Sequence, residues 1–338
     1  MLSTTIVLAL GAYGATEPVF NGPLDPAGRL LKITENSSPQ GSRNPIKSGG
    51  ANAASLGING SLGGRRMFPD DNPWNTPIDT EPVDPLSDSI ISTIGANDPL
   101  HPDFGANWNG GPFGIPYIVV SKNQPKVPMD FIWYGDESDP GPYPFPPNAP
   151  VENGSDRHVL VIDVDNWILY ETFYSFYVGP GWQTACGAKF DLNSNALRPD
   201  GWTSADAAGL PILAGLVRYD EVYEQGAINH ALRFTVQITR KAYIHPATHY
   251  ASSNTSTNRP PMGTRFRLKA SFDISSYPPH AQVILRALKK YGMFVADNGS
   301  DMFLSGTADP RWNDDEMNTL KNVKASDFEV VKMGPIHQ

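Results

Sequence analysis

The chain has 338 residues, including 31 Gly and 32 Pro, and a formal net charge of −9. So many prolines exclude a long coiled coil or a helical repeat array, because a proline breaks or kinks a helix interior. The 15 Phe, 13 Tyr and 7 Trp residues argue against wholesale disorder, and the lack of a Lys/Arg cluster argues against a nucleic-acid partner. A loop-rich, strand-dominated globular protein remains.

The N-terminus carries the pattern of an export signal. Residues 1–14 hold an apolar run from Leu2 to Leu10, followed by the small residues Ala12 and Gly14 before a cleavage point. We therefore expect a secreted or extracellular protein, and no other run approaches the ~20 apolar residues of a membrane span. Five Asn-x-Ser/Thr motifs would carry glycans in a secreted glycoprotein: Asn36, Asn59, Asn153, Asn254 and Asn298.

Residues 15–66 are rich in Gly, Ser, Asn and Pro and poor in aromatics. This composition predicts an extended arm or linker. It is either a disordered leader or an ordered arm docked on its own domain or on a neighbouring subunit. Docking on a neighbouring subunit would make a homo-oligomer. Residues 67–338 then form one β-rich domain.

In chain order, the first predicted elements of that domain are a short helix, two strands, a proline-rich surface loop and a hairpin. The loop has too few free amide donors to be a central strand, and the hairpin consists of two β-rich runs joined by a short polar turn. These elements span Asp84–Ile94, Gly114–Val120, Val127–Trp133, Gly135–Pro150, and Arg157–Asp163 with Trp167–Phe173.

The second half adds strands and one convincing helix. Ser276–Tyr291 places apolar residues at helical spacing and ends before Gly292. The pattern predicts a β-rich α+β fold, with a β-sandwich or jelly-roll core and this long helix packed on it. The remaining predicted elements are strands at Ala231–Thr239, Thr264–Ile274 and Phe328–Lys332, a hairpin over 293–304 and a short helix over 314–320.

Five strings of sequence resemble those of a family of secreted proteins. They are Asp136–Pro144, Arg157–Val161, Leu197–Glu221, His230–Thr235 and Ala296–Ser300. The resemblance covers most of the domain and implies secretion, but it brings no fold, activity or site residue with it.

Several standard catalytic signatures are absent. The sequence has no Gly-x-Ser-x-Gly elbow, Walker A loop, His-Glu-x-x-His helix or EF-hand loop. The only cysteine, Cys186, lies in an apolar stretch and is expected to be a buried core residue. Common hydrolase and nucleotide-binding classes are therefore disfavoured.

Carboxylates and aromatics are interleaved between Asp191 and Glu221. Sugars stack on aromatic rings and donate to carboxylates, and two carboxylates suffice for glycoside hydrolysis. We expect Asp206, in a loop of small residues, to be the general acid and Asp191 the base or nucleophile. Trp202, Tyr219 and Asp220 would then bind substrate. The alternative is that these aspartates cap turns.

Histidines supply a second set of candidates. His230 and His249 could transfer protons or orient substrate, and Arg265 and Arg267 could neutralise a uronate in β-elimination. The His245-x3-His249 spacing suits a metal on a helix, but Pro246 disfavours a helix there. Structural, hydrogen-bonded histidines are the alternative.

Asp136, Glu137 and Asp139 form a tight acidic cluster. Their oxygens could bind Ca²⁺ together with backbone carbonyls, or they could form a solvated acidic turn. No other cofactor is required.

Together these patterns predict a secreted polysaccharide-active enzyme, with hydrolysis favoured over β-elimination and a polysaccharide or glycan as partner. The alternative is a non-catalytic extracellular protein that binds glycans or assembles into a surface layer or filament. The enzyme hypothesis expects Asp206, Asp191 and at least one of His230 and His249 to converge in one concave site.

Overall fold

The computed structural model describes residues 54–338. The predicted export signal and most of the predicted arm lie outside the described residues. Residues 54–66 of the arm belong to a compact unit that spans Ala51–Gln338. Strand β1 (Gly57–Ile58) pairs with β5 (Tyr117–Val120), and Leu62 is buried in the main core. Among the described helices, none is long and apolar enough to cross a membrane.

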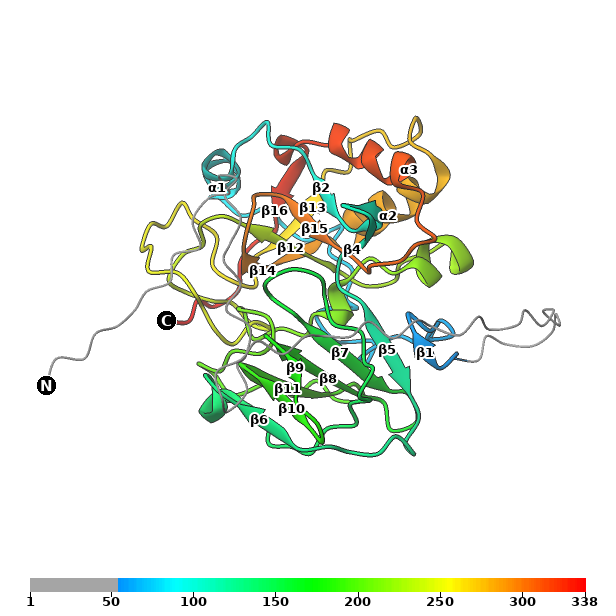
Figure 1. Ribbon diagram of the computed structural model, residues 1–338. Coiled ribbons are helices and arrows are strands. Elements are labelled where there is room, and N and C mark those ends of the chain that lie inside the picture. Colours follow the sequence, from blue (N-terminus) through cyan, green and yellow to red (C-terminus); the bar gives the residue numbers. More distant parts are fainter. Residues whose placement is uncertain (1–53) are drawn as a thin grey trace, which may run out of the picture. The chain divides into compact units, whose positions relative to one another are not determined.

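A five-stranded sheet occupies one half of the described unit (Figure 1). Its order is β1-β5-β7-β8-β11, where β7 is Val159–Asp163, β8 is Ile168–Phe173 and β11 is Cys186–Asp191. Strands β7 and β8 form the predicted hairpin. The Asp163 carboxylate stabilises its turn by accepting from the amides of Asp165 and Asn166.

A six-stranded sheet lies in the other half, beside the helices (Figure 1). Its order is β16-β13-β14-β12-β15-β2, and it mixes parallel with antiparallel pairs. The strands are β2 His101–Asp103, β12 Leu232–Val236, β13 Arg265–Leu268, β14 Met293–Asn298, β15 Phe303–Ser305 and β16 Phe328–Val330.

Helix α2 (Pro279–Lys290) packs on β13 through an apolar face. Ala281, Ile284 and Leu288 on that face are buried, as the spacing predicts, and Pro279 suits the first helical turn. The helix is shorter than the predicted 276–291. Two smaller helices, α1 (Ser87–Ile94) and α3 (Asp314–Asn318), complete this half, with the hairpin of β3 (Gly105–Trp108) and β4 (Gly111–Phe113).

One hydrophobic cluster joins the two large sheets. It contains Leu160 and Ile162 of β7 together with Phe234 of β12 and Val295 of β14. The fold is therefore β-rich α+β around a shared core. A sandwich or jelly-roll arrangement is not confirmed, because both large sheets contain parallel as well as antiparallel pairs.

A second hydrophobic cluster lies beneath the proline-rich segment. Tyr143 and Phe145 are fully buried there, against Tyr170 of β8 and Trp182. A small sheet flanks this cluster, formed by β6 (Met129–Phe131), β10 (Trp182–Thr184) and β9 (Phe176–Tyr177). The prediction of a surface loop over Gly135–Pro150 is thus wrong in part, because the aromatics between the prolines anchor the segment in the interior.

Replacing Phe145 with Ala should lower the free energy of unfolding by roughly 3–5 kcal/mol, because the variant leaves a cavity in this second core. Denaturant unfolding measures the change. The exposed Tyr134 provides the control, since its replacement by Ala should change stability by about 0.5 kcal/mol or less. Equal effects of the two substitutions would contradict the anchoring role of Phe145.

Candidate functional site

A buried guanidinium pairs with a buried carboxylate in the interior. Arg233 lies on β12 and is 4% exposed, and Asp206 is 0% exposed. The Arg233 Nε donates to Asp206 Oδ2 at 3.2 Å, and its Nη1 donates to Ser305 Oγ at 2.6 Å. Because unpaired buried charges are costly, this pairing fixes both side chains in place.

The Asp206 loop, residues 203–209, is folded tightly into the core. Hydroxyl groups of Thr203 and Ser204 donate to the Asp206 carbonyl, and so does the amide of Gly209. Gly209 has φ +73°, and a Cβ there would lie 2.1 Å from Thr248 Oγ1. The loop residues are small because they are packed, whereas the sequence suggested small residues for ligand access.

Asp297 is the second carboxyl group of the cluster. It lies half-buried near the end of β14, just after a register shift in the β12–β14 pairing that leaves Ala296 unpaired. Such a bulge re-aims the following side chain. The loop amide of Ala208 donates to the Ala296 carbonyl at 3.1 Å. Loop and strand are therefore joined next to Asp297.

The two carboxyl groups do not hold their charges equally. Burial raises the pKa of Asp297 to about 7, and the nearby negative charge of Asp206 adds to this effect while Arg233 opposes it. Burial also raises the pKa of Asp206, but Arg233 contacts it directly and favours its ionised form. Near neutral pH the shared proton therefore resides mainly on Asp297.

His158 supports the same loop from β7. Its Nδ1 lies 2.5 Å from Glu152 Oε2, and its Nε2 donates to the Ala205 carbonyl at 3.0 Å. Burial lowers the pKa of His158, but the charge of Glu152 and its hydrogen bond outweigh burial and raise the pKa to about 9. The imidazole is therefore a cation at neutral pH and holds the Asp206 loop by a charge-assisted bond.

Glu171 of β8 is fully buried beneath residues 212–213, which follow the Asp206 loop. Its two carboxylate oxygens accept from the amides of Ile212 and Leu213, each at 2.8 Å. Burial raises the pKa of Glu171 to about 7, against these two hydrogen bonds. Both oxygens are engaged with backbone, so Glu171 positions the 3₁₀ turn Leu213–Gly215.

The structure does not bring the predicted catalytic residues together. Asp191 is exposed at the end of β11, where it caps a turn by accepting from Asn193. His249 is closer to the cluster, because its Nδ1 bonds the Ala207 carbonyl at 2.8 Å. Of the predicted set, only His249 contacts the Asp206 loop, whereas Asp191 and His230 lie elsewhere.

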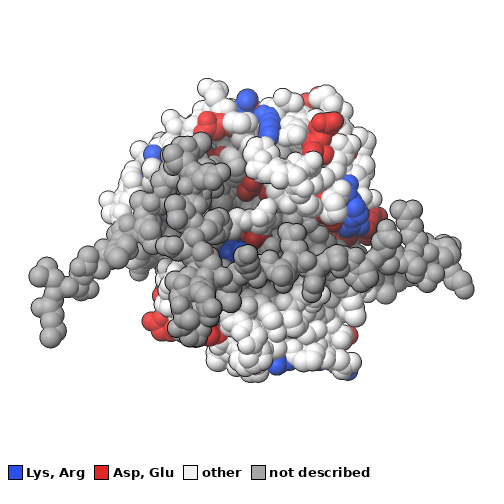
Figure 2. Space-filling view, viewed as in Figure 1, with Lys and Arg blue, Asp and Glu red and all other residues white. Residues whose placement is uncertain are grey.

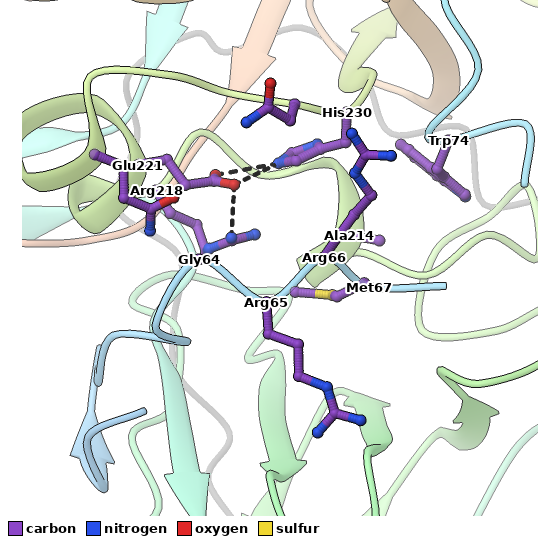
Figure 3. A pocket seen from close by; sticks show the side chains of 11 residues that line it. Gly64, Arg65, Arg66, Met67, Trp74, Ala214, Arg218, Glu221 and His230 are labelled. Carbon is purple, nitrogen blue, oxygen red and sulfur yellow. Dashed lines mark hydrogen bonds and ion pairs between the residues drawn. The ribbon is translucent and has the colours of Figure 1, made fainter. Parts of the chain in front are cut away.

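His230 lines a cavity of about 160 Å³. Figure 3 shows its ring directed at Glu221, which also pairs with Arg218, while Arg65 points away. His230 Nε2 lies 3.1 Å from both Glu221 oxygens, its Nδ1 bonds the Ala231 carbonyl at 2.7 Å, and Arg218 Nη2 lies 2.7 Å from Glu221. Every ring nitrogen has a partner, so the cavity offers no free base on His230.

The predicted substrate-binding residues have structural contacts. Asp220 is buried and accepts from Leu62, Tyr219 stacks on Tyr223 at 4.6 Å, and the guanidinium of Arg198 lies 5.6 Å from the Trp202 ring. Arg265 and Arg267 lie on β13, next to the edge strand β16 of the six-stranded sheet. Arg265 donates to the carbonyls of Tyr291 and Thr76, and Arg267 pairs with Glu329 at 2.7 Å.

The predicted Ca²⁺ ligands are largely engaged with the protein. Asp139 accepts from the Lys189 amide and pairs with Arg198, and Glu137 accepts from the Thr203 amide at 2.8 Å. Asp136 is exposed. Over residues 54–338 these three do not form a group of converging ligand atoms. Calcium binding here stays a prediction.

Sequence reasoning missed Arg233, Asp297 and the His158–Glu152 pair. Three of these four residues lie in strings that carry the resemblance, as does Asp206, so those strings converge on one place in the fold. Asp297 was interpreted as part of a hairpin turn, and Arg233 as one polar residue in a strand. A charged residue within a strand of otherwise apolar neighbours was the available signal.

Burial raises the pKa of Asp297 in the cluster to about 7, whereas both ring nitrogens of His230 in the cavity already have hydrogen-bond partners. We therefore place the candidate site at Asp297, Asp206 and Arg233, although the cavity lies elsewhere. Comparison with models of protein families, with curated proteins and with solved structures finds no match for this chain. The assignment rests on geometry and electrostatics.

Replacing Arg233 with Met should lower the free energy of unfolding by roughly 3–5 kcal/mol, because it leaves a buried carboxylate without its partner. Combining it with Asp206→Asn should recover part of the loss, and a double-mutant cycle measures the coupling. The exposed Arg66–Asp70 pair is the control, and Arg66→Met should cost about 0.5 kcal/mol or less. If the loss of stability in the double variant equals the sum of the losses in the two single variants, the coupling is refuted.

Asp297 should make the protein less stable as the pH rises from about 4 to 7. Its pKa is raised on folding, so the folded state binds the proton more tightly and this advantage disappears as the group ionises. Asp297→Asn should therefore flatten the dependence of the free energy of unfolding on pH. Relative to the natural chain, the variant should be more stable at pH 8 than at pH 4 by about 1–3 kcal/mol. Asp191→Asn, at an exposed site, should leave the curve unchanged. Parallel curves for all three proteins would contradict the buried proton.

Proposed function

We propose that the chain is a secreted enzyme that hydrolyses glycosidic bonds, with Asp297 as the proton donor. The observation that carries this proposal is the raised pKa of Asp297, about 7, at a half-buried position beside Asp206 and Arg233. A glycosidase needs a carboxylic acid that still holds its proton near neutral pH to protonate the leaving oxygen. Asp297 meets that requirement.

Asp206 takes a different role in this proposal from the one its sequence suggests. Its side chain is fully buried and paired, so it cannot reach a substrate oxygen. Its negative charge instead helps to keep the proton on Asp297, which makes it a positioning residue. Asp103 is exposed, lies opposite Ser305 in the β2–β15 register and is close enough to Arg233 to interact with its charge, and it is our choice for the base or nucleophile.

The charge distribution favours a neutral substrate over a polyuronate. The chain carries a net charge of −9, and Figure 2 shows a mostly uncharged face with small scattered groups of both signs. A polyanion would be repelled by the net charge, and the described residues visible on this face form no continuous basic stripe (Figure 2). Arg265 and Arg267, which elimination would require, are engaged in the sheet. These points favour hydrolysis over β-elimination.

Asp297→Asn should reduce turnover by about 10²–10⁴-fold on a polysaccharide that the natural chain cleaves, because general acid catalysis is worth about that much. The natural enzyme should lose activity as the pH rises above about 7, where Asp297 ionises. Reducing ends released from a panel of neutral and uronate polysaccharides measure hydrolysis. The ultraviolet absorbance of unsaturated uronates measures elimination.

Asp191→Asn is the matched control, since it removes one exposed carboxylate outside the cluster. It should keep full activity. Full activity in Asp297→Asn, or loss of activity in Asp191→Asn alone, would refute Asp297 as the acid. No product from any substrate would favour a non-catalytic protein.

A second candidate function, glycan binding without catalysis, is favoured by an exposed aromatic surface. Trp133 is 55% exposed and stacks on Tyr174 at 4.8 Å, and Tyr177 and Val178 are exposed nearby in sequence. Aromatic faces of this kind bind the C–H face of sugars. If this function holds, Trp133→Ala should abolish retention on insoluble polysaccharide while Asp297→Asn retains it.

A further inference from the structure

Three side chains with metal-binding atoms converge at a surface site apart from the acid cluster. They are Asp200, His245 and His337, and their ligand atoms all lie within 4.8 Å of one another. His245 Nε2 lies 2.8 Å from Asp200 Oδ1. The three come from different segments, and His337 lies 92 residues after His245, so their meeting is a product of the fold.

Backbone hydrogen bonds hold the three segments together. His337 and Tyr243 exchange two of them, at 3.0 and 2.9 Å, and the Gly201 amide donates to the Thr248 carbonyl at 2.7 Å. Main-chain hydrogen bonds therefore hold His337 itself and Gly201, the residue after Asp200. Ile244, the residue before His245, donates its amide to the Met262 carbonyl at 2.9 Å. This arrangement does not depend on an ion to form.

The rings are also ordered. The His245 and His337 rings stack with centroids 4.3 Å apart, and the Tyr243 ring stacks on His337 at 5.2 Å. The Asp200 carboxylate therefore faces the His245 ring, which in turn lies against His337. The Tyr243 ring also restrains His337, and contacts of this kind orient ligands in metal sites.

We propose that Asp200, His245 and His337 bind one divalent transition-metal ion, with Zn²⁺ as the reference ion. Two imidazoles and one carboxylate suit zinc and its first-row neighbours, whereas Ca²⁺ and Mg²⁺ prefer oxygen ligands alone. Ligand atoms around a tetrahedral zinc lie roughly 3.3 Å apart, given bonds of about 2.0–2.1 Å. Asp200 and His245 are exposed and His337 is half-buried, so atoms that already lie within 4.8 Å of one another can reach that spacing by small side-chain rotations.

The proposed site differs from both metal sites that the sequence suggested. His249, whose spacing from His245 would suit a metal only on a helix, bonds the Ala207 carbonyl. The site is nevertheless linked to the Asp206 loop, because the amides of Thr248 and His249 both donate to the Ala208 carbonyl. A bound ion would fasten His337 to the segment that supports this loop.

The test uses the full chain without a polyhistidine tag, stripped with a chelator and titrated with ZnCl₂ by calorimetry. We expect one ion per chain, a weakening of at least about tenfold in His337→Ala and His245→Ala, and a zinc-dependent rise in Tm that these variants lack. His280→Ala is the matched control, because the His280 and His245 side chains are 37% and 40% exposed. It should bind zinc as the natural chain does.

Folding of the variants is checked by their Tm in chelator, which should equal that of the natural chain. His337→Gln provides a second, milder variant if His337→Ala is destabilised. The absence of zinc binding to the natural chain, or unchanged affinity in both His337→Gln and His245→Ala, would overturn the proposal. None of these readouts depends on catalytic activity, so they test the metal site separately from the proposed hydrolysis.

Discussion

The ion pair of Arg233 and Asp206 is the interaction on which the polar centre of this protein depends. A guanidinium placed within a sheet loses its hydration, and a carboxylate in contact with it must compensate. Burial raises the pKa of the neighbouring Asp297 to about 7, the charge of Asp206 adds to the rise, and Arg233 opposes it. The chemistry we propose follows from that raised pKa.

The Asp206 loop brings the carboxylate to Arg233 without helix or strand of its own. Its carbonyl groups therefore need partners from elsewhere. His158 binds the Ala205 carbonyl, His249 binds that of Ala207, and the amides of residues 248 and 249 donate to that of Ala208. His249, which the sequence suggested for proton transfer, thus acts in its observed contact as a support for the loop, as His158 does.

Local patterns could be predicted from the sequence, and tertiary pairings could not. The hairpin of β7 and β8 and the apolar face of α2 depend on neighbours a few residues apart, and both were predicted. The burial of Tyr143 depends on strands that are distant in the chain, and the proline-rich composition concealed it. The small residues around Asp206 were a real signal, although they indicate tight packing.

The candidate site shows the same division. Asp206 was identified because of its unusual loop, but its partners Arg233 and Asp297 come from strands whose charges look solvent-facing in a one-dimensional pattern. Asp191 was joined to Asp206 only by closeness in sequence, and the fold places it at an exposed turn. Likewise, nothing near His245 in the sequence points to His337.

The most direct test of the account is the titration of the Asp297 carboxyl group itself. Carboxyl ¹³C chemical shifts recorded across the pH range, with Asp297→Asn to assign the signal, report its ionisation. The account predicts a midpoint at about pH 7. A midpoint close to the ordinary value of 3.8 would contradict it, because Asp297 would then carry no proton to donate near neutral pH.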